Sequence, residues 1–215
     1  FLFFCLLMAY APVFALTDEQ IASSQKKVAD RPLGERIVFW AETFIGTPYD
    51  PDPLGEYVTR KVIVADERVD CMYLSFRSLE LALGHTPGES LDIALDKRFR
   101  TKGVLEGGKV INYEDRFEYG EDMLDSGKWG KEITENIGPL TSLPGTRGRQ
   151  QIEMVSKHTL MQVMKKRGRN PAFKTGDFIF FIKAPGKRVS DEMVGHIGII
   201  TVEGDSVFLI NASGR

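Results

Sequence analysis

The chain carries three kinds of side chain that together support thiol acyl-transfer chemistry. Cys71 lies in Val69-Asp70-Cys71 at the start of an apolar run, and His196 interrupts an apolar segment far downstream. Asn211 closes a second apolar segment near the end of the sequence. A cysteine nucleophile, a histidine base and a polar side chain that orients the histidine are the components of such a site. The sequence therefore predicts Cys71, His196 and Asn211 as catalytic residues.

The thiolate of Cys71 would need help from a neighbouring charge. A helix N-terminus stabilises an anion by only about 0.3–1 kcal/mol. Lowering a thiol pKa from about 8.5 to about 4 requires roughly 6 kcal/mol, so an imidazolium must supply most of it. His196 is the best candidate, because a histidine within an apolar strand costs solvation free energy unless it has partners.

Each of the three residues also has a plainer interpretation. A lone buried cysteine is usually a packing residue. A histidine in a strand is more often a satisfied core residue than a base, and an asparagine before Ala-Ser-Gly is typical of a turn. The three together, with export and a helix-start position for the cysteine, favour catalysis.

Two predicted elements position these residues. Met72, Phe76, Leu79 and Leu83 recur at helical spacing, which predicts a helix over 71–83 with Asp70 as its N-cap and Gly84 as its stop. A strand is predicted over 178–182, and a hairpin over 194–202 and 207–212. If Glu203 and Gly204 are the central turn residues, His196 faces Asn211 across the hairpin. Helices followed by strands indicate an α+β fold.

The N-terminus differs in character from the rest of the chain. Residues 1–15 are nearly all apolar and too short to span a bilayer, so we expect a secretory signal peptide that is truncated at its front. Residues 16–31 are expected to form a linker or loose helix, and 32–215 a hydrolase domain whose last strand lies beyond the sequence. Cys5 leaves with the signal, so Cys71 is the single thiol of an exported, periplasmic or envelope protein.

The bulk composition removes several partner classes. The formal net charge is −2, which does not favour nucleic-acid binding. The three histidines lack zinc-ligand spacing and no glycine-rich phosphate loop of the usual spacing is present, so we expect neither a metal nor another cofactor. No stable membrane insertion is expected after signal cleavage.

The motifs resemble those of the NlpC-type cell-wall hydrolases, which are papain-like cysteine peptidases and amidases. The matching segments are 44–49 (FIGTPY), 69–71 (VDC), 176–177 (GD) and 195–199 (GHIGI). The loop over 50–69 and the segment 112–117 (NYEDRF) resemble the subgroup described as N-acetylmuramoyl-L-alanine amidase-like. The resemblance extends from about Glu35 to the end of the chain.

This resemblance implies a papain-like fold in which a helical lobe, with the nucleophile on its central helix, packs on a small antiparallel β-sheet. It implies Cys71 as nucleophile, His196 as general base and Asn211 as the third polar residue. Residues expected to bind substrate are Tyr49, which lines the cleft, Asp70, which reads a substrate amine, and Tyr113, Arg116 and Ser213.

The implied reaction is hydrolysis of an amide in peptidoglycan or muropeptides, between N-acetylmuramic acid and L-alanine. A stem-peptide endopeptidase of the same fold, a non-catalytic wall-binding protein with a decayed site, and a lipid acyltransferase on this fold are the alternatives. The chain departs from the family at Phe117-Glu118-Tyr119, where the amidase-like subgroup usually has a histidine shortly after the arginine. That departure bears on which bond is cut more than on the chemistry.

Overall fold

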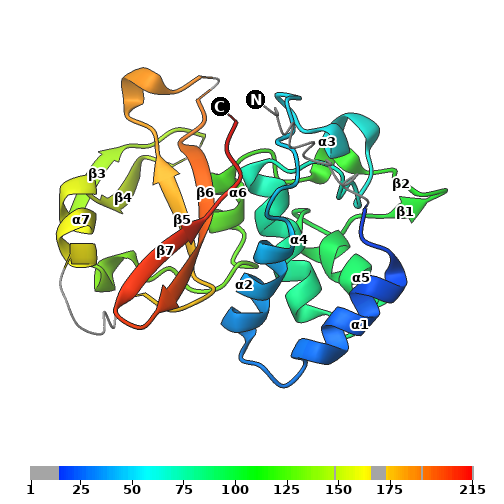
Figure 1. The fold of residues 1–215 in the computed structure, drawn as a ribbon. Helices are drawn as coiled ribbons and strands as arrows, with labels where there is room; N and C mark the ends of the chain where they lie inside the picture. The colour runs from blue at the N-terminus through cyan, green and yellow to red at the C-terminus, as the bar shows by residue number, and fades with distance from the viewer. Residues whose placement is uncertain (1–14, 148, 166–172, 190, 215) are drawn as a thin grey trace, which may run out of the picture.

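The computed structural model describes residues 15–147, 149–165, 173–189 and 191–214. It is an α+β protein with small antiparallel sheets, as predicted. Helices α1 to α5 gather on one side together with the hairpin of β1 and β2, strands β3 to β7 lie on the other side together with α7, and α6 lies between the two groups (Figure 1). The helices are α1 (Asp18–Val28), α2 (Leu33–Thr43), α3 (Glu56–Arg60), α4 (Cys71–Leu83), α5 (Pro87–Lys97), α6 (Gly120–Asp125) and α7 (Lys157–Lys165).

The strands form three separate sheets. Two are hairpins, made by β1 (Leu105–Glu106) with β2 (Lys109–Val110) and by β3 (Leu140–Pro144) with β4 (Gln151–Val155). The third contains β5 (Phe178–Ile182), β6 (Val194–Glu203) and β7 (Ser206–Ile210) in that order. Short 3-10 helices lie at Tyr113–Asp115, Thr134–Asn136 and Pro185–Lys187.

Helix α4 is the central helix and has the bounds that its sequence predicts. The Asp70 carboxylate accepts the Tyr73 N–H at 2.6 Å, which caps the first turn, and Gly84 follows the last helical residue. Every residue from Tyr73 to Ala82 is buried. The helix packs against α2, α5 and β6, so its first residue is held in the middle of the molecule.

A buried ionic network links α4 to the loop before it and to the end of α5. Arg77 forms a bidentate pair with Asp66, at 2.8 and 2.9 Å. Arg98 from the end of α5 forms another with Glu80, at 2.6 and 2.7 Å, and also donates to the Ile63 carbonyl at 2.8 Å. The four side chains of these pairs are at most 3% exposed. The charges are thus buried as hydrogen-bonded pairs, which is the arrangement in which a protein interior tolerates them.

The predicted strand over 178–182 and the predicted hairpin are both present, but the predicted turn is wrong by one residue. Glu203 pairs with Ser206, so Gly204 and Asp205 are the central turn residues. Gly204 has φ 58°, which suits the first central position of a type II′ turn, where glycine is preferred. Extending this register would place Ser213, not Asn211, opposite His196.

The two faces of the three-stranded sheet have different roles. Ile197 and Ile199 lie in the main core, and their cross-strand partners Phe180 and Phe178 pack against it. His196 pairs with Phe181, and each directly neighbours a core-facing residue of its own strand. Because successive side chains of a strand point to opposite faces, both lie on the other face. Their rings lie 5.9 Å apart. The core face of the sheet therefore meets α4, while the imidazole lies on the opposite face.

The predicted signal segment 1–15 lies almost entirely outside the described residues. Residues 16–31, expected as a linker or loose helix, contain the regular helix α1, which begins with a capping box from Thr17 and buries Ile21 in the main core. Within the described part of the chain, no helix has both the length and the apolar character needed to cross a bilayer.

Candidate active site

Cys71, the first residue of α4, lies beside β6, the central strand of the three-stranded sheet. Its thiol lies close to the Ile197 N–H, which favours the thiolate. The Ile200 N–H donates to the Asp177 carbonyl at 2.8 Å, and this bond lies on the side of β6 that faces β5. The N–H groups of successive strand residues point to alternate sides, so the Ile197 N–H, three residues earlier, points to the side of β7. Pairing with β7 ends at Ile199 and Ile210, which leaves this side of Ile197 open to the cysteine.

The resting thiol is neutral. Burial, followed by the charge of the Asp70 carboxylate, raises the pKa of Cys71 to about 11. The backbone N–H groups of Ile197, Cys71 and Met72 act in the opposite direction but are weaker. The expected benefit of the helix N-terminus is offset because the capping carboxylate occupies it. Forming the thiolate therefore requires a base that accepts the proton and stays beside the sulfur as a cation.

His196 and Asn211 form the pair that could supply this base. The imidazole Nε2 lies 3.0 Å from Asn211 Oδ1. An amide oxygen can only accept, so Nε2 carries the hydrogen and Nδ1 of the neutral ring is free to accept one. Asn211 reaches His196 diagonally, because the chain leaves the β7 ladder after Ile210. The expected pairing thus occurs despite the shifted turn.

The Cys71 thiol approaches the strand at the residue that follows His196. Cys71 lies against Ile197, the residue after His196, and no hydrogen bond between its sulfur and the ring is among those of the described residues. Such contacts in ligand-free hydrolases often tighten only when substrate binds. The structure therefore brings all three predicted catalytic residues to one end of β6.

Tyr49 and Ser213 lie beside this group. With Asn211 they line a cavity of about 310 Å³, whose remaining walls come from the end of α2, Val69 and Leu74 beside the nucleophile, and the chain after β7. Burial, and next the charge of Cys71, raises the pKa of Tyr49, so this ring is near the sulfur. The ring also lies against Gly214, where an added Cβ would come within 3.0 Å of it.

Asp70 caps α4 and is itself largely buried. Burial raises its pKa to about 6, and the nearby Asp50 carboxylate acts in the same direction. Asp50 is 4% exposed and accepts the N–H groups of Asp52 and Glu56, at 3.0 and 2.6 Å. Sequence reasoning missed Asp50, although its Asp-Pro-Asp-Pro setting signals a tight loop. Asp50 therefore shapes the loop behind the predicted amine-reading carboxylate.

Tyr113 and Arg116 are placed differently from the other predicted residues. Tyr113 is 5% exposed in a second core cluster, and its hydroxyl donates to the Tyr57 carbonyl at 3.1 Å. Arg116 is partly buried above the Tyr113 ring, 5.6 Å from its centre. Neither lines the cavity beside Asn211. Their part in substrate binding stays a prediction.

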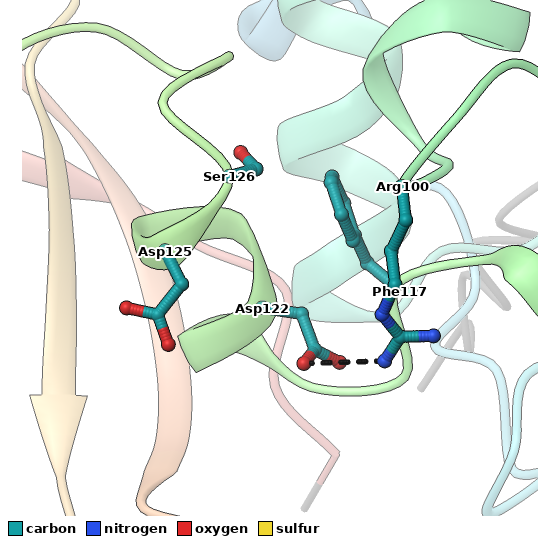
Figure 2. Close-up of a pocket in the computed structure, with 5 residues that line it drawn as sticks. All are labelled: Arg100, Phe117, Asp122, Asp125 and Ser126. Atoms are coloured by element: carbon teal, nitrogen blue, oxygen red, sulfur yellow. Dashed lines mark hydrogen bonds and ion pairs between the residues drawn. The ribbon is translucent and has the colours of Figure 1, made fainter. Parts of the chain in front are cut away.

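A second hollow, of about 220 Å³, lies by α6 and is shown in Figure 2. Its lining residues are Arg100, Phe117, Asp122, Asp125 and Ser126. Arg100 points across it to Asp122, 3.4 Å away. No predicted catalytic residue lines this hollow. Within the described ranges, no group of three or more His, Cys, Asp or Glu side chains is arranged to hold a metal ion.

Comparison with known proteins identifies structural neighbours only. No protein-family model and no curated protein sequence matches the chain. An N-acetylmuramoyl-L-alanine amidase from Bacteroides uniformis superimposes with a TM-score of 0.59 and 17% identity, over 84% of this chain and 85% of that one. The chain shares that amidase's fold.

Two further structures have the same fold. A DUF1460 protein from Legionella pneumophila gives a TM-score of 0.64 and 16% identity, over 91% of this chain and 83% of that one. A Bacteroides fragilis protein described as a candidate xylanase gives 0.51 and 19%, over 80% of this chain and 86% of that one. Proteins with different names share this architecture, so the reaction must be argued from the site.

Proposed function

We propose that the chain is an exported, NlpC-type papain-like cysteine amidase that cleaves peptidoglycan or muropeptides between N-acetylmuramic acid and L-alanine. The observation that carries the proposal is the 3.0 Å contact of His196 Nε2 with Asn211 Oδ1 at the end of β6, with the Cys71 thiol close to the backbone N–H of the next residue, Ile197. The fold shared with a solved amidase supports the choice of substrate.

The proposed reaction proceeds in two steps. Nδ1 of His196 takes the thiol proton, and the Cys71 sulfur attacks the lactyl carbonyl carbon of the muramic acid. The Cys71 N–H, at the start of α4, stabilises the oxyanion. The C–N bond then breaks as the imidazolium gives its proton to the alanine nitrogen. A water molecule, deprotonated by His196, hydrolyses the thioester and restores the thiol.

A non-catalytic wall-binding protein is the second candidate, and the raised pKa of Cys71 favours it. A thiol that stays protonated near neutral pH is a poor nucleophile unless the imidazole accepts its proton. The same cavity could then hold a muropeptide without cutting it. In the amidase Cys71 is required for turnover, whereas in the wall-binding protein it is a packing residue and no turnover occurs.

The test is product analysis by mass spectrometry after incubation with a defined muramyl tripeptide. We expect free N-acetylmuramic acid and an intact peptide beginning with alanine. Cys71→Ala and His196→Ala should abolish turnover without changing the melting curve, whereas His158→Ala, at an exposed histidine of α7, should not affect turnover. A cut inside the peptide would indicate an endopeptidase, and binding without cleavage would indicate the non-catalytic protein.

A further inference from the structure

A buried carboxylate holds the start of the strand that carries His196. Glu121 in α6 is 1% exposed, and its two oxygens accept the N–H groups of Met193 and Val194 at 3.0 and 3.1 Å. Burying a carboxylate costs several kcal/mol unless it is hydrogen-bonded or paired. The Arg147 Nε, 3.9 Å from Glu121 Oε1, supplies a positive charge. This carboxylate is thus committed to the backbone just before His196.

The backbone held by Glu121 contains an irregularity in the β5–β6 ladder. Phe181 pairs with His196, but the next residue, Ile182, pairs with Val194, so Gly195 is an extra residue in β6. Val194 lies in the main core, on the face that meets α4. In a regular strand Val194 and His196, two positions apart, would share a face, and the extra residue places them on opposite faces instead. His196 keeps the face that its pairing with Phe181 gives it, where Asn211 meets it, and the bulge lies directly before it.

A bulge of this kind leaves backbone groups without ladder partners. The Met193 carbonyl accepts from the Lys183 N–H at 2.8 Å, but Met193 is fully buried, so water cannot reach its own N–H. Unpaired buried N–H groups are rare and costly. The Glu121 oxygens satisfy the N–H groups of both Met193 and Val194, and this keeps the bulge in one conformation.

The neighbourhood of Glu121 favours a fixed position for α6. A Cβ on Gly120 would lie 2.5 Å from Val194 Cγ1, so only glycine allows α6 to approach β6 this closely. On its other side α6 presents Asp122 to Arg100, at 3.4 Å (Figure 2). The helix is therefore held on both sides, and Glu121 cannot easily move away from the bulge.

We propose that Glu121 is a positioning residue for His196: by holding the bulge at 193–195 it fixes the backbone directly before His196, and with it the height at which the imidazole meets Asn211. The catalytic part of this inference rests on the proposed function. The structural part, that Glu121 fixes the ring, does not.

The test compares Glu121→Ala and Glu121→Gln with the control Glu118→Ala. Glu118 is exposed and, like Glu121, forms an ion pair with Arg147. We expect Glu121→Ala to lower kcat by about 100-fold with little change in KM, because a misplacement of about 1 Å can have that effect. Glu121→Gln keeps one accepting oxygen, so its kcat should lie between those of the wild type and of Glu121→Ala. Glu118→Ala should leave kcat unchanged.

A second readout does not depend on turnover. Nitrogen-15 spectra of the imidazole should show His196 shifted in Glu121→Ala and unchanged in Glu118→Ala, with the rings of His85 and His158 serving as internal references. A Glu121→Ala protein that folds and keeps the wild-type kcat and His196 ring signals would overturn the inference. If the wild-type chain shows no turnover, the proposed function fails, and the ring signals still decide the positioning role.

Folding failure of the alanine variant would not end the test, because Glu121→Gln then carries the same comparison. If neither variant folds, amide exchange of Met193 and Val194 is measured in the unmodified chain. Slow exchange of both amides supports their hydrogen bonds to Glu121, and exchange as fast as in exposed loops contradicts them.

Discussion

The two halves of the candidate site are held in different ways. On the nucleophile side, α4 is surrounded by the Asp66–Arg77 and Glu80–Arg98 pairs, all at most 3% exposed. On the base side, Asn211 is exposed and His196 is half-buried, and the strand start is held by Glu121. The helix that carries the sulfur is therefore held by buried pairs, whereas the imidazole depends on a few contacts at the end of the central strand β6. Perturbations should affect stability on the first side and turnover on the second.

Breaking the buried network should have the largest effect. Arg98→Met removes both hydrogen bonds to the buried Glu80 carboxylate and leaves it only the Arg77 guanidinium at 3.8 Å, which we expect to lower the free energy of unfolding by about 3–5 kcal/mol. Urea denaturation followed by circular dichroism measures the change. Arg100→Met is the matched control, because Arg100 pairs with Asp122 at the surface with 47% of its side chain exposed. Its expected cost is under about 1 kcal/mol.

Next in size is the effect of losing the histidine's partner. General-base catalysis is worth about 10²–10⁴-fold, so Asn211→Ala, which frees the ring to adopt the wrong tautomer, should lower kcat by about 100-fold. Because Asn211 is exposed, the free energy of unfolding should change by less than about 0.5 kcal/mol. Asn136→Ala, at an exposed asparagine far along the chain, is the control. Steady-state kinetics on the muramyl tripeptide give the answer, and equal kcat in both variants would show that the 3.0 Å contact has no catalytic role.

The smallest expected effect concerns the carboxylate that caps α4. Asp70→Asn keeps an accepting oxygen for the Tyr73 N–H but removes the charge that raises the pKa of Cys71. The thiol pKa should fall from about 11, which the pH dependence of iodoacetamide labelling measures. Asp205→Asn, in the exposed hairpin turn, should leave labelling unchanged.

The same substitution has a pH-dependent effect on stability. The pKa of Asp70 is raised from 3.8 to about 6, so its burial favours folding of the protonated form and opposes folding of the charged one. Below about pH 4 the free energy of unfolding of the wild type should equal or exceed that of Asp70→Asn. As the pH rises through about 6 it should fall relative to the variant, by about 1–2 kcal/mol at pH 8. A difference that does not vary with pH would contradict the raised pKa.

Local patterns predicted much of the frame. Helix α4 has its predicted bounds, because periodic apolar residues, an N-cap and a following glycine all act within one stretch of chain. The pairing of His196 with Asn211 was also expected, although the turn is shifted by one residue. Both Glu203-Gly204 and Gly204-Asp205 are compatible with a tight turn, and the preference for glycine at the first position separates them.

Contacts between distant segments were not predictable in this way. Glu121 lies in a stretch of mixed pattern, and its partners are 72 and 73 residues away. Glu80 is held bidentately by Arg98, from the end of the next helix, whereas the neighbouring Arg77 forms its hydrogen bonds with Asp66 and lies 3.8 Å from Glu80. The pKa of Cys71 depends on burial and on which groups face the sulfur, and neither is visible in the spacing of residues. Such features appear only once the elements are packed.

The pairing of Glu80 with Arg98 has a consequence for how this protein can evolve. Losing either member alone leaves a buried charge without its bidentate partner, whereas exchanging both for apolar side chains of similar volume is often tolerated. Positions 80 and 98 should therefore change together among homologues, with intermediates rarely surviving. A library that randomises both codons and selects for folding would recover matched pairs, charged or apolar, and few mixed ones.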